Sequence, residues 1–111
     1  MFMLLVTGDR IGRGDEELGA LLMKNFLYSL ARAETKPDLV GFMNAGVRLT
    51  CEGSQSLDDL RLLAKQGVSV RSCGTCLDYL RLKDSLAVGE VGTMSDTVAA
   101  AAAAGKVITV G

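Results

Sequence analysis

The chain has 111 residues, of which 49% are hydrophobic, and this suffices for one domain with a core of its own. Its 12 basic and 13 acidic residues nearly cancel, so the charge does not indicate binding to nucleic acid or to an anionic membrane surface. The apolar runs fall well short of the roughly 20 residues that a membrane-spanning helix needs. The short N-terminal run also lacks the preceding basic residues of a signal peptide.

Histidine is absent, which excludes Cys–His and Ser–His–Asp catalysis and any histidine metal ligand. The three cysteines, Cys51, Cys73 and Cys76, could form only an incomplete zinc site, so we expect neither a metal nor another cofactor. In a domain with an ample core they are more typical of free thiols in a reducing compartment than of a secreted disulfide framework. We therefore expect a cytoplasmic protein.

Residues 2–7 form a continuously apolar run that is typical of a strand covered on both faces. A glycine-rich loop, residues 8–14, follows this run. Asp15 is expected to cap a helix that extends to about Ala33, with two acidic residues in its first turn. Apolar residues cover more of this helix than a single stripe, which predicts either an ordinary well-covered helix or a face that packs against another subunit.

Residues 38–43 are the second predicted strand, and residues 44–54 form a long turn with two glycines. Ser56 is expected to cap the next helix, with Asp59 three residues later as a weaker form of the capping box. Gly67 is expected to end that helix.

A β-type run from Val68 leads into Cys73, and a short helix is expected over residues 76–83. Residues 87–91 are a fourth predicted strand. Ser95 or Asp96 should cap a last helix that contains six consecutive alanines, and residues 107–110 form a fifth strand.

The alternation of five apolar runs with four helices predicts a three-layer α/β/α fold around a five-stranded, mainly parallel sheet. We expect this sheet to be flavodoxin-like. The first and third strands are neighbours in that order, and ligands bind where such strands end. The loop of residues 8–14 would then face Cys73 across one crevice.

The segment Cys73-Gly-Thr-Cys76 lies where a strand passes into a helix, so unpaired helical N–H groups should favour a thiolate there. Two thiols at this spacing can act as a nucleophile and a resolving partner, whereas a structural interpretation makes them small buried residues. We predict Cys73 as the sulfur acceptor and Cys76 as its partner. Cys51, which has no cysteine near it in sequence, is more typical of a packed thiol.

A thiolate that dominates at neutral pH needs a pKa about two units below ~8.5, or about 2.7 kcal/mol, and a helix N-terminus contributes only ~0.3–1 kcal/mol. Backbone N–H groups or nearby arginines must therefore contribute. Arg10 and Arg13 are the preferred candidates, before Arg48 and Arg71, because their loop should face the cysteines. Besides the two cysteines, the candidate substrate-binding residues are Arg10, Gly12, Gly14, Asn44, Gly74 and Thr75.

The chain resembles the DsrE-like domain of the YedF-type, sulfurtransferase-like selenium metabolism proteins. The matching segments include Gly12-x-Gly14-Asp15-Glu-Glu-Leu18-Gly19, Asn44-x-Gly46-Val47 and Cys73-Gly74-Thr75-Cys76-Leu77-Asp78. The resemblance implies a five-stranded α/β/α fold, assembly into homo-oligomers, and a persulfide on the cysteine after the third strand. It also implies a TusA-like domain as a partner, although we expect residues 1–111 to form a single DsrE-like domain without one.

These observations lead us to expect a sulfur or selenium carrier, a sulfurtransferase-like relay between donor and acceptor proteins. The first alternative is a dithiol redox module; the sole proline, Pro37, is far from the cysteines in sequence, which disfavours a thioredoxin-type site. The second alternative is a non-catalytic binding or oligomerisation domain.

Overall fold

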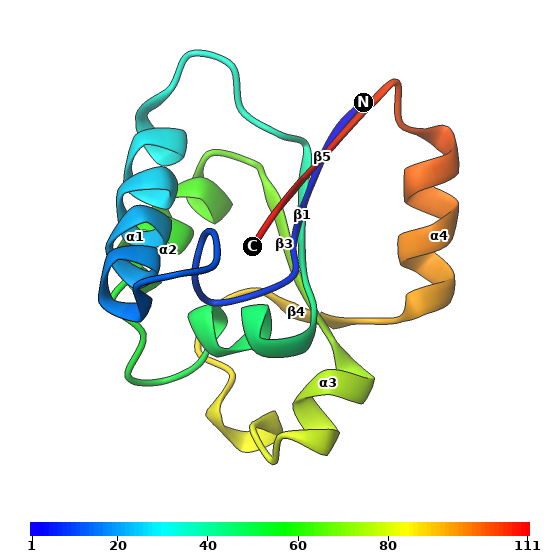
Figure 1. Cartoon of the computed structure of the whole chain (residues 1–111). Coiled ribbons are helices and arrows are strands. Elements are labelled where there is room, and N and C mark those ends of the chain that lie inside the picture. Colours follow the sequence, from blue (N-terminus) through cyan, green and yellow to red (C-terminus); the bar gives the residue numbers. More distant parts are fainter.

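A computed structural model describes all 111 residues of the chain (Figure 1). One sheet of five parallel strands runs through the molecule in the order β4-β3-β2-β1-β5. The strands are β1 (Phe2–Val6), β2 (Leu39–Phe42), β3 (Ser69–Cys73), β4 (Glu90–Gly92) and β5 (Lys106–Val110). The prediction of a parallel five-stranded α/β fold is confirmed.

Helices flank the sheet unevenly. The α-helices are α1 (Glu16–Arg32), α2 (Leu57–Lys65), α3 (Gly74–Tyr79) and α4 (Met94–Ala103), and the 3₁₀ helices are η1 (Asn44–Thr50) and η2 (Lys83–Ser85). In Figure 1, α1 and α2 cover one face of the sheet, α4 stands alone on the other, and α3 lies at one end. None of these helices has the length and apolar character needed to span a membrane.

The strand order corrects one expectation. Strand β2 lies between β1 and β3, so the first and third strands are not neighbours. The chain steps in one direction from β1 to β4 and only β5 returns to the free side of β1, where the two pair in parallel. Right-handed crossovers therefore place α1 and α2 on one face and α4, which belongs to the returning step, on the other. The point at which the order reverses is β1/β5.

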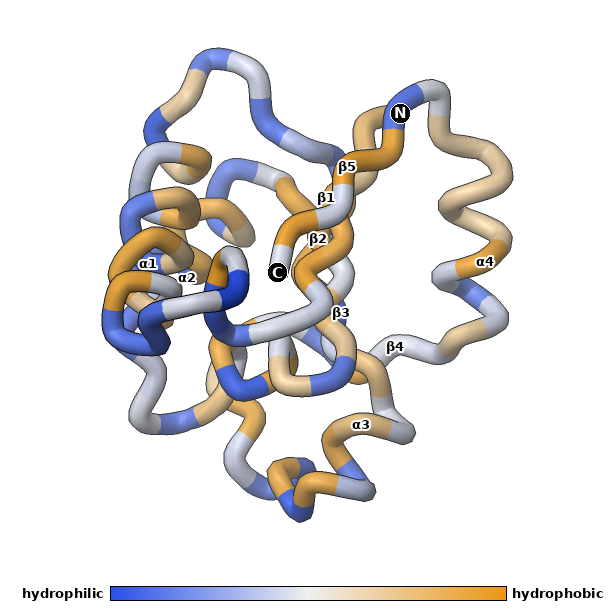
Figure 2. The backbone as a smooth tube through the Cα atoms, viewed as in Figure 1, coloured by the Kyte–Doolittle hydropathy of each residue, from blue (hydrophilic) through white to orange (hydrophobic).

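The main core lies between the sheet and the α1–α2 layer, where the hydrophobic segments of Figure 2 converge. Alternate residues of β1, β2 and β3 point into it, as the two-residue period of a strand requires. From the sheet it contains Leu4, Val6, Val40, Phe42 and Val70, and from the helices Met23, Leu27, Ala31, Leu60 and Leu63. Asp15 caps α1 as predicted, because its Oδ1 accepts the N–H of Leu18 at 2.8 Å.

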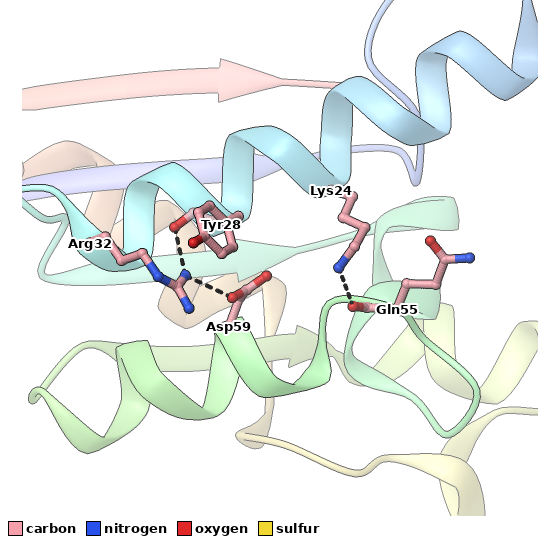
Figure 3. Close-up of polar contacts among 5 residues, drawn as sticks. All are labelled: Lys24, Tyr28, Arg32, Gln55 and Asp59. Atoms are coloured by element: carbon pink, nitrogen blue, oxygen red, sulfur yellow. Dashed lines mark hydrogen bonds and ion pairs between the residues drawn. The ribbon is translucent and has the colours of Figure 1, made fainter.

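The start of α2 differs from the prediction. Ser56 precedes α2, but its side chain accepts no N–H from the helix, and Asp59 does not complete a capping box. Asp59 instead points toward α1, where its Oδ1 accepts a hydrogen bond from Arg32 at 2.9 Å (Figure 3). Arg32 also donates to the carbonyl of Tyr28 and stacks 3.6 Å above the centre of its ring. Asp59 thus joins α2 to α1 and does not take part in the predicted capping box within α2.

Arg32→Met should lower the free energy of unfolding by about 1–2 kcal/mol, because Asp59 is 5% exposed and loses its only charged partner. The expected loss is small for a buried carboxylate because the Arg32 side chain is 44% exposed and solvent screens the pair. Urea unfolding measures the change. The double variant Arg32→Met/Asp59→Asn should recover part of the loss, and equal stability of the single variant and the parent would contradict the pairing.

The last helix is also capped differently. Thr93, and neither Ser95 nor Asp96, caps α4: its Oγ1 accepts the N–H of Asp96 at 3.1 Å. No residue of α4 is buried. Helix α4 stands alone on this face of the sheet (Figure 1), and four of the five residues of β5 are exposed, so the face is thinly covered.

Candidate functional site

The cysteine pair lies where β3 ends. Cys73 is both the last residue of β3 and the residue that precedes the first turn of α3, and Cys76 lies within that turn. Both are free thiols and partly exposed. The helix begins at Gly74, two residues earlier than the sequence predicts, so both sulfurs belong to one strand-to-helix turn at the carboxyl edge of the sheet.

A backbone amide approaches one of the two sulfurs. The N–H of Asn44 donates to Cys76 Sγ at 3.1 Å. Asn44 follows β2, the neighbour of β3, so the parallel register brings the two strand ends together. Asn44 adopts a left-handed conformation, with φ of 51°, and opens η1. The sequence predicts a turn over residues 44–54, whereas η1 occupies the first seven of them.

Close packing fixes the position of η1. A Cβ on Gly46 would lie 2.3 Å from the carbonyl oxygen of Val6, at the end of β1. Only a residue without a side chain allows this approach. Gly46 thus holds η1 against the sheet, and η1 in turn presents the amide of Asn44 to Cys76.

The pKa of Cys76 is raised above its ordinary value. Burial is the largest cause, and a hydrogen bond with the Cys73 side chain and the negative charge that Cys73 acquires act in the same direction. The hydrogen bond from the amide of Asn44 lowers the pKa, but by less than the other causes raise it. The expectation that the helix start and nearby arginines would lower this pKa is therefore wrong for Cys76, because desolvation outweighs one amide and no arginine contributes. Burial and the contact with Cys73 therefore favour the protonated form of Cys76.

The two thiols line different depressions. Cys73 lines a narrow cleft between the sheet and the start of α4, with room of about 20 Å³ and with Arg71, Thr93 and Met94 among its walls. Cys76 lines a wider pocket of about 260 Å³, with Asn44, Thr75, Tyr79 and Leu80. The side chain of Tyr79 is 86% exposed at the rim of this pocket. The sequence pattern predicts that Tyr79 and Leu80 turn inward from this helix, which is wrong for Tyr79, and it did not identify either residue as part of the site.

The remaining predicted site residues divide into two groups. Asn44, Gly74 and Thr75 are brought to the cysteine turn, and a Cβ on Gly74 would lie 3.0 Å from Val91. Arg10, Gly12 and Gly14 are not, because β2 separates the end of β1 from the end of β3. Arg10 instead lies 3.6 Å from Asp9 and 4.0 Å from Glu16. Gly12 and Gly14 have φ of 82° and 134° in an open loop.

Cys51 is a packed thiol. It is 2% exposed, and its Sγ donates to the carbonyl of Val47 at 3.2 Å. It lines neither of the two depressions that contain Cys73 and Cys76.

Burial raises the pKa of Cys51, although a hydrogen bond with Thr50 and the charge of Arg48 oppose the shift. A pKa that is higher in the folded state than in the unfolded state gives stability that is complete below the unfolded pKa. That stability is lost as the pH rises toward the folded pKa. Unfolding free energies measured from pH 7 to 10 should therefore fall less steeply for Cys51→Ala than for the parent, and parallel curves would contradict this assignment.

No protein-family model matches the sequence, and no curated protein matches it. Two solved structures are similar over nearly the whole chain. The ychN protein from E. coli has a TM-score of 0.74 and 23% identity, with 97% of each chain covered. MTH1491 from Methanobacterium thermoautotrophicum, a protein of unknown function, has a TM-score of 0.70 and 21% identity, with 97% of this chain and 96% of that chain covered.

YchN is a DsrE-like fold protein. The present chain has a DsrE-like fold. At these identities the likeness establishes the fold and nothing about the reaction. In this DsrE-like fold the two free thiols share the carboxyl edge of the sheet with the amide of Asn44, and no cluster of three or more candidate metal ligands accompanies them.

Proposed function

We propose that the chain is a sulfur or selenium carrier of the YedF-type, which holds a persulfide on Cys73 and relays it to a partner protein. The observation that carries this proposal is the asymmetry of the cysteine pair. Cys73 lies at the carboxyl end of β3, directly before the first turn of α3. Cys76 lies within that turn, accepts the amide of Asn44, and is favoured in its thiol form because burial raises its pKa. Both residues are accessible enough for a partner's sulfur to approach.

Loading is a displacement at sulfur. The Cys73 thiolate attacks the outer sulfur of a donor persulfide, the new S–S bond forms, and the donor thiolate leaves. Transfer repeats the step in the other direction: a thiolate of the acceptor attacks the outer sulfur, and the electron pair of the broken bond returns to Cys73. No oxidant or reductant is consumed.

The partners that this proposal requires are a persulfide donor and a thiol acceptor, with a TusA-like domain as the acceptor that the family resemblance suggests. The wider pocket beside Cys76 supports the approach of a protein rather than a charged small molecule, because none of its five lining residues carries a charge. The rim formed by Tyr79 offers an aromatic contact, a residue type enriched at protein interfaces.

Mass spectrometry after incubation with a protein persulfide donor tests the proposal against its alternatives. A carrier gains the mass of one sulfur atom, and the gain disappears in Cys73→Ser. A dithiol redox module shows only a reversible loss of two hydrogens on oxidation. A binding domain shows neither change.

We further propose that copies of the chain associate. Helix α1 exposes an apolar stripe that includes Leu18, Leu21, Leu22 and Tyr28, and the opposite side exposes a second patch at Met94, Val98 and Val107. The second patch is the stronger candidate because α4 has no buried residue and leaves the sheet thinly covered. A molar mass above 11.7 kDa by light scattering supports association, and a monomer at all concentrations contradicts it.

A further inference from the structure

A second pocket lies away from the cysteine pair, between α1 and the segment that joins η1 to α2. Its volume is about 320 Å³, at the lower end of the ~300–1,000 Å³ typical of small-ligand pockets. Ala20, Leu49 and Leu82 supply an apolar part of its wall. The pocket shares no lining residue with either depression that contains Cys73 or Cys76.

Charged side chains of both signs line this pocket. Lys24 reaches across from α1 and its Nζ donates to the carbonyl of Gln55 at 3.0 Å, which fixes the ammonium at the wall (Figure 3). Arg48 and Glu52 also line the pocket, and neither forms an ion pair within the chain. Asp9 is the fourth charge, and its contact with Arg10 is a loose one at 3.6 Å.

The hydroxyl of Ser56 lines the same pocket. Ser56 is 2% exposed, and its Oγ is not a buried atom left without a partner, so the hydroxyl is open to the pocket and available to a ligand there. Ser56 also precedes α2, whose first amides receive no side-chain cap and carry the partial positive charge of a helix start.

Together these groups offer donors for an anionic group and acceptors for a cationic one. Two cations and two carboxylates leave the pocket without net charge, which disfavours a polyanion such as a nucleotide. We infer that the pocket binds a small zwitterion with one carboxylate and one ammonium group, of the size of an α-amino acid with a short apolar side chain. The carboxylate would bind Lys24, Arg48 and Ser56, and the ammonium would bind Glu52 and Asp9.

The test uses the ¹⁵N-labelled full chain and L-valine as the probe. The backbone amides of residues 53–57 should shift saturably, with a Kd on the order of 1 mM. Isovalerate lacks the ammonium group and isobutylamine lacks the carboxylate, so each should bind about tenfold more weakly than L-valine. Isovalerate or inorganic phosphate binding as well as L-valine would overturn the inference in favour of a plain anion site. The absence of any saturable shift would also overturn it.

Two exposed residues supply variants that leave the fold intact. Arg48→Gln and Glu52→Gln should each weaken L-valine binding about tenfold, because each removes one charged hydrogen-bond partner. Arg13→Gln and Glu34→Gln make the same chemical changes at exposed positions outside the pocket and should leave binding unchanged. Ser56→Ala should weaken binding by a similar factor. Cys73→Ser should bind L-valine normally, so this test is independent of the proposed sulfur relay. Unchanged binding in Arg48→Gln and Glu52→Gln would contradict the site.

Discussion

Replacing Gly46 with alanine is expected to lower the free energy of unfolding by about 3 kcal/mol or more. The added Cβ would lie 2.3 Å from the carbonyl oxygen of Val6 and 3.1 Å from its carbon. Both atoms belong to the backbone of β1, which pairs with β2 and β5 on its two sides. No side-chain rotation can relieve the contact, so η1 must move away from the sheet. Thermal unfolding followed by circular dichroism should show a midpoint lower by at least ~10 °C.

Gly105→Ala is the matched control. A Cβ on Gly105 meets no atom within 4 Å, and the residue is not in the left-handed region. Its unfolding free energy should stay within about 0.5 kcal/mol of the parent. If Gly46→Ala were as stable as Gly105→Ala, η1 would not pack on β1 as described, and the placement of the Asn44 amide beside Cys76 would lose its support.

The second large effect concerns the relay itself. Cys73→Ser should reduce persulfide transfer to a thiol acceptor at least about a hundredfold, because a serine hydroxyl is not ionised at neutral pH and cannot carry the sulfane atom. Transfer is measured with a protein persulfide donor and a thiol acceptor followed by mass spectrometry. Cys51→Ser is the control: the buried hydroxyl can keep the bond to the Val47 carbonyl, and transfer should remain at the parent level.

Cys76→Ser separates the two roles. The variant should still gain one sulfur atom, on Cys73, because the nucleophile is intact. In the parent, the Cys76 thiolate could also attack the inner sulfur of the Cys73 persulfide, which forms the Cys73–Cys76 disulfide and expels hydrosulfide. Cys76→Ser cannot take this route, so hydrosulfide release without an acceptor should stop in the variant. Complete loss of loading in Cys76→Ser, with normal loading in Cys73→Ser, would reverse the assignment of nucleophile and partner.

Much of the fold could be predicted because hydrophobic periodicity is a local property. The five strands, the start of α1 at Asp15 and the strand-to-helix turn at Cys73 all follow from patterns within about ten residues. Strand order is different, because it depends on how whole units pack on one another. Nothing in the run of residues 2–7 indicates that β2 and β5, and not β3, will lie beside it.

The site was predictable in part for the same reason. Cys73 and Cys76 stand at a position that the local pattern defines. The contact between Asn44 and Cys76 joins residues 32 apart in sequence. The raised pKa of Cys76 depends on burial, which no local pattern reports. Ser56 and Asp59 fit a capping box in sequence, but Asp59 pairs with Arg32 of another helix, and a local pattern does not report that contact.

The measurement that tests the central claim most directly is the rate of alkylation of each cysteine as a function of pH, resolved by peptide mass spectrometry. Cys73 should be alkylated before Cys76 at neutral pH, and the rate at Cys76 should rise only above the pH of an ordinary thiol, because burial and Cys73 raise its pKa. In Cys73→Ser the profile of Cys76 should move to lower pH, since the hydrogen bond and the charge of Cys73 are gone. Alkylation of Cys76 ahead of Cys73, with a profile that Cys73→Ser leaves unchanged, would contradict the account.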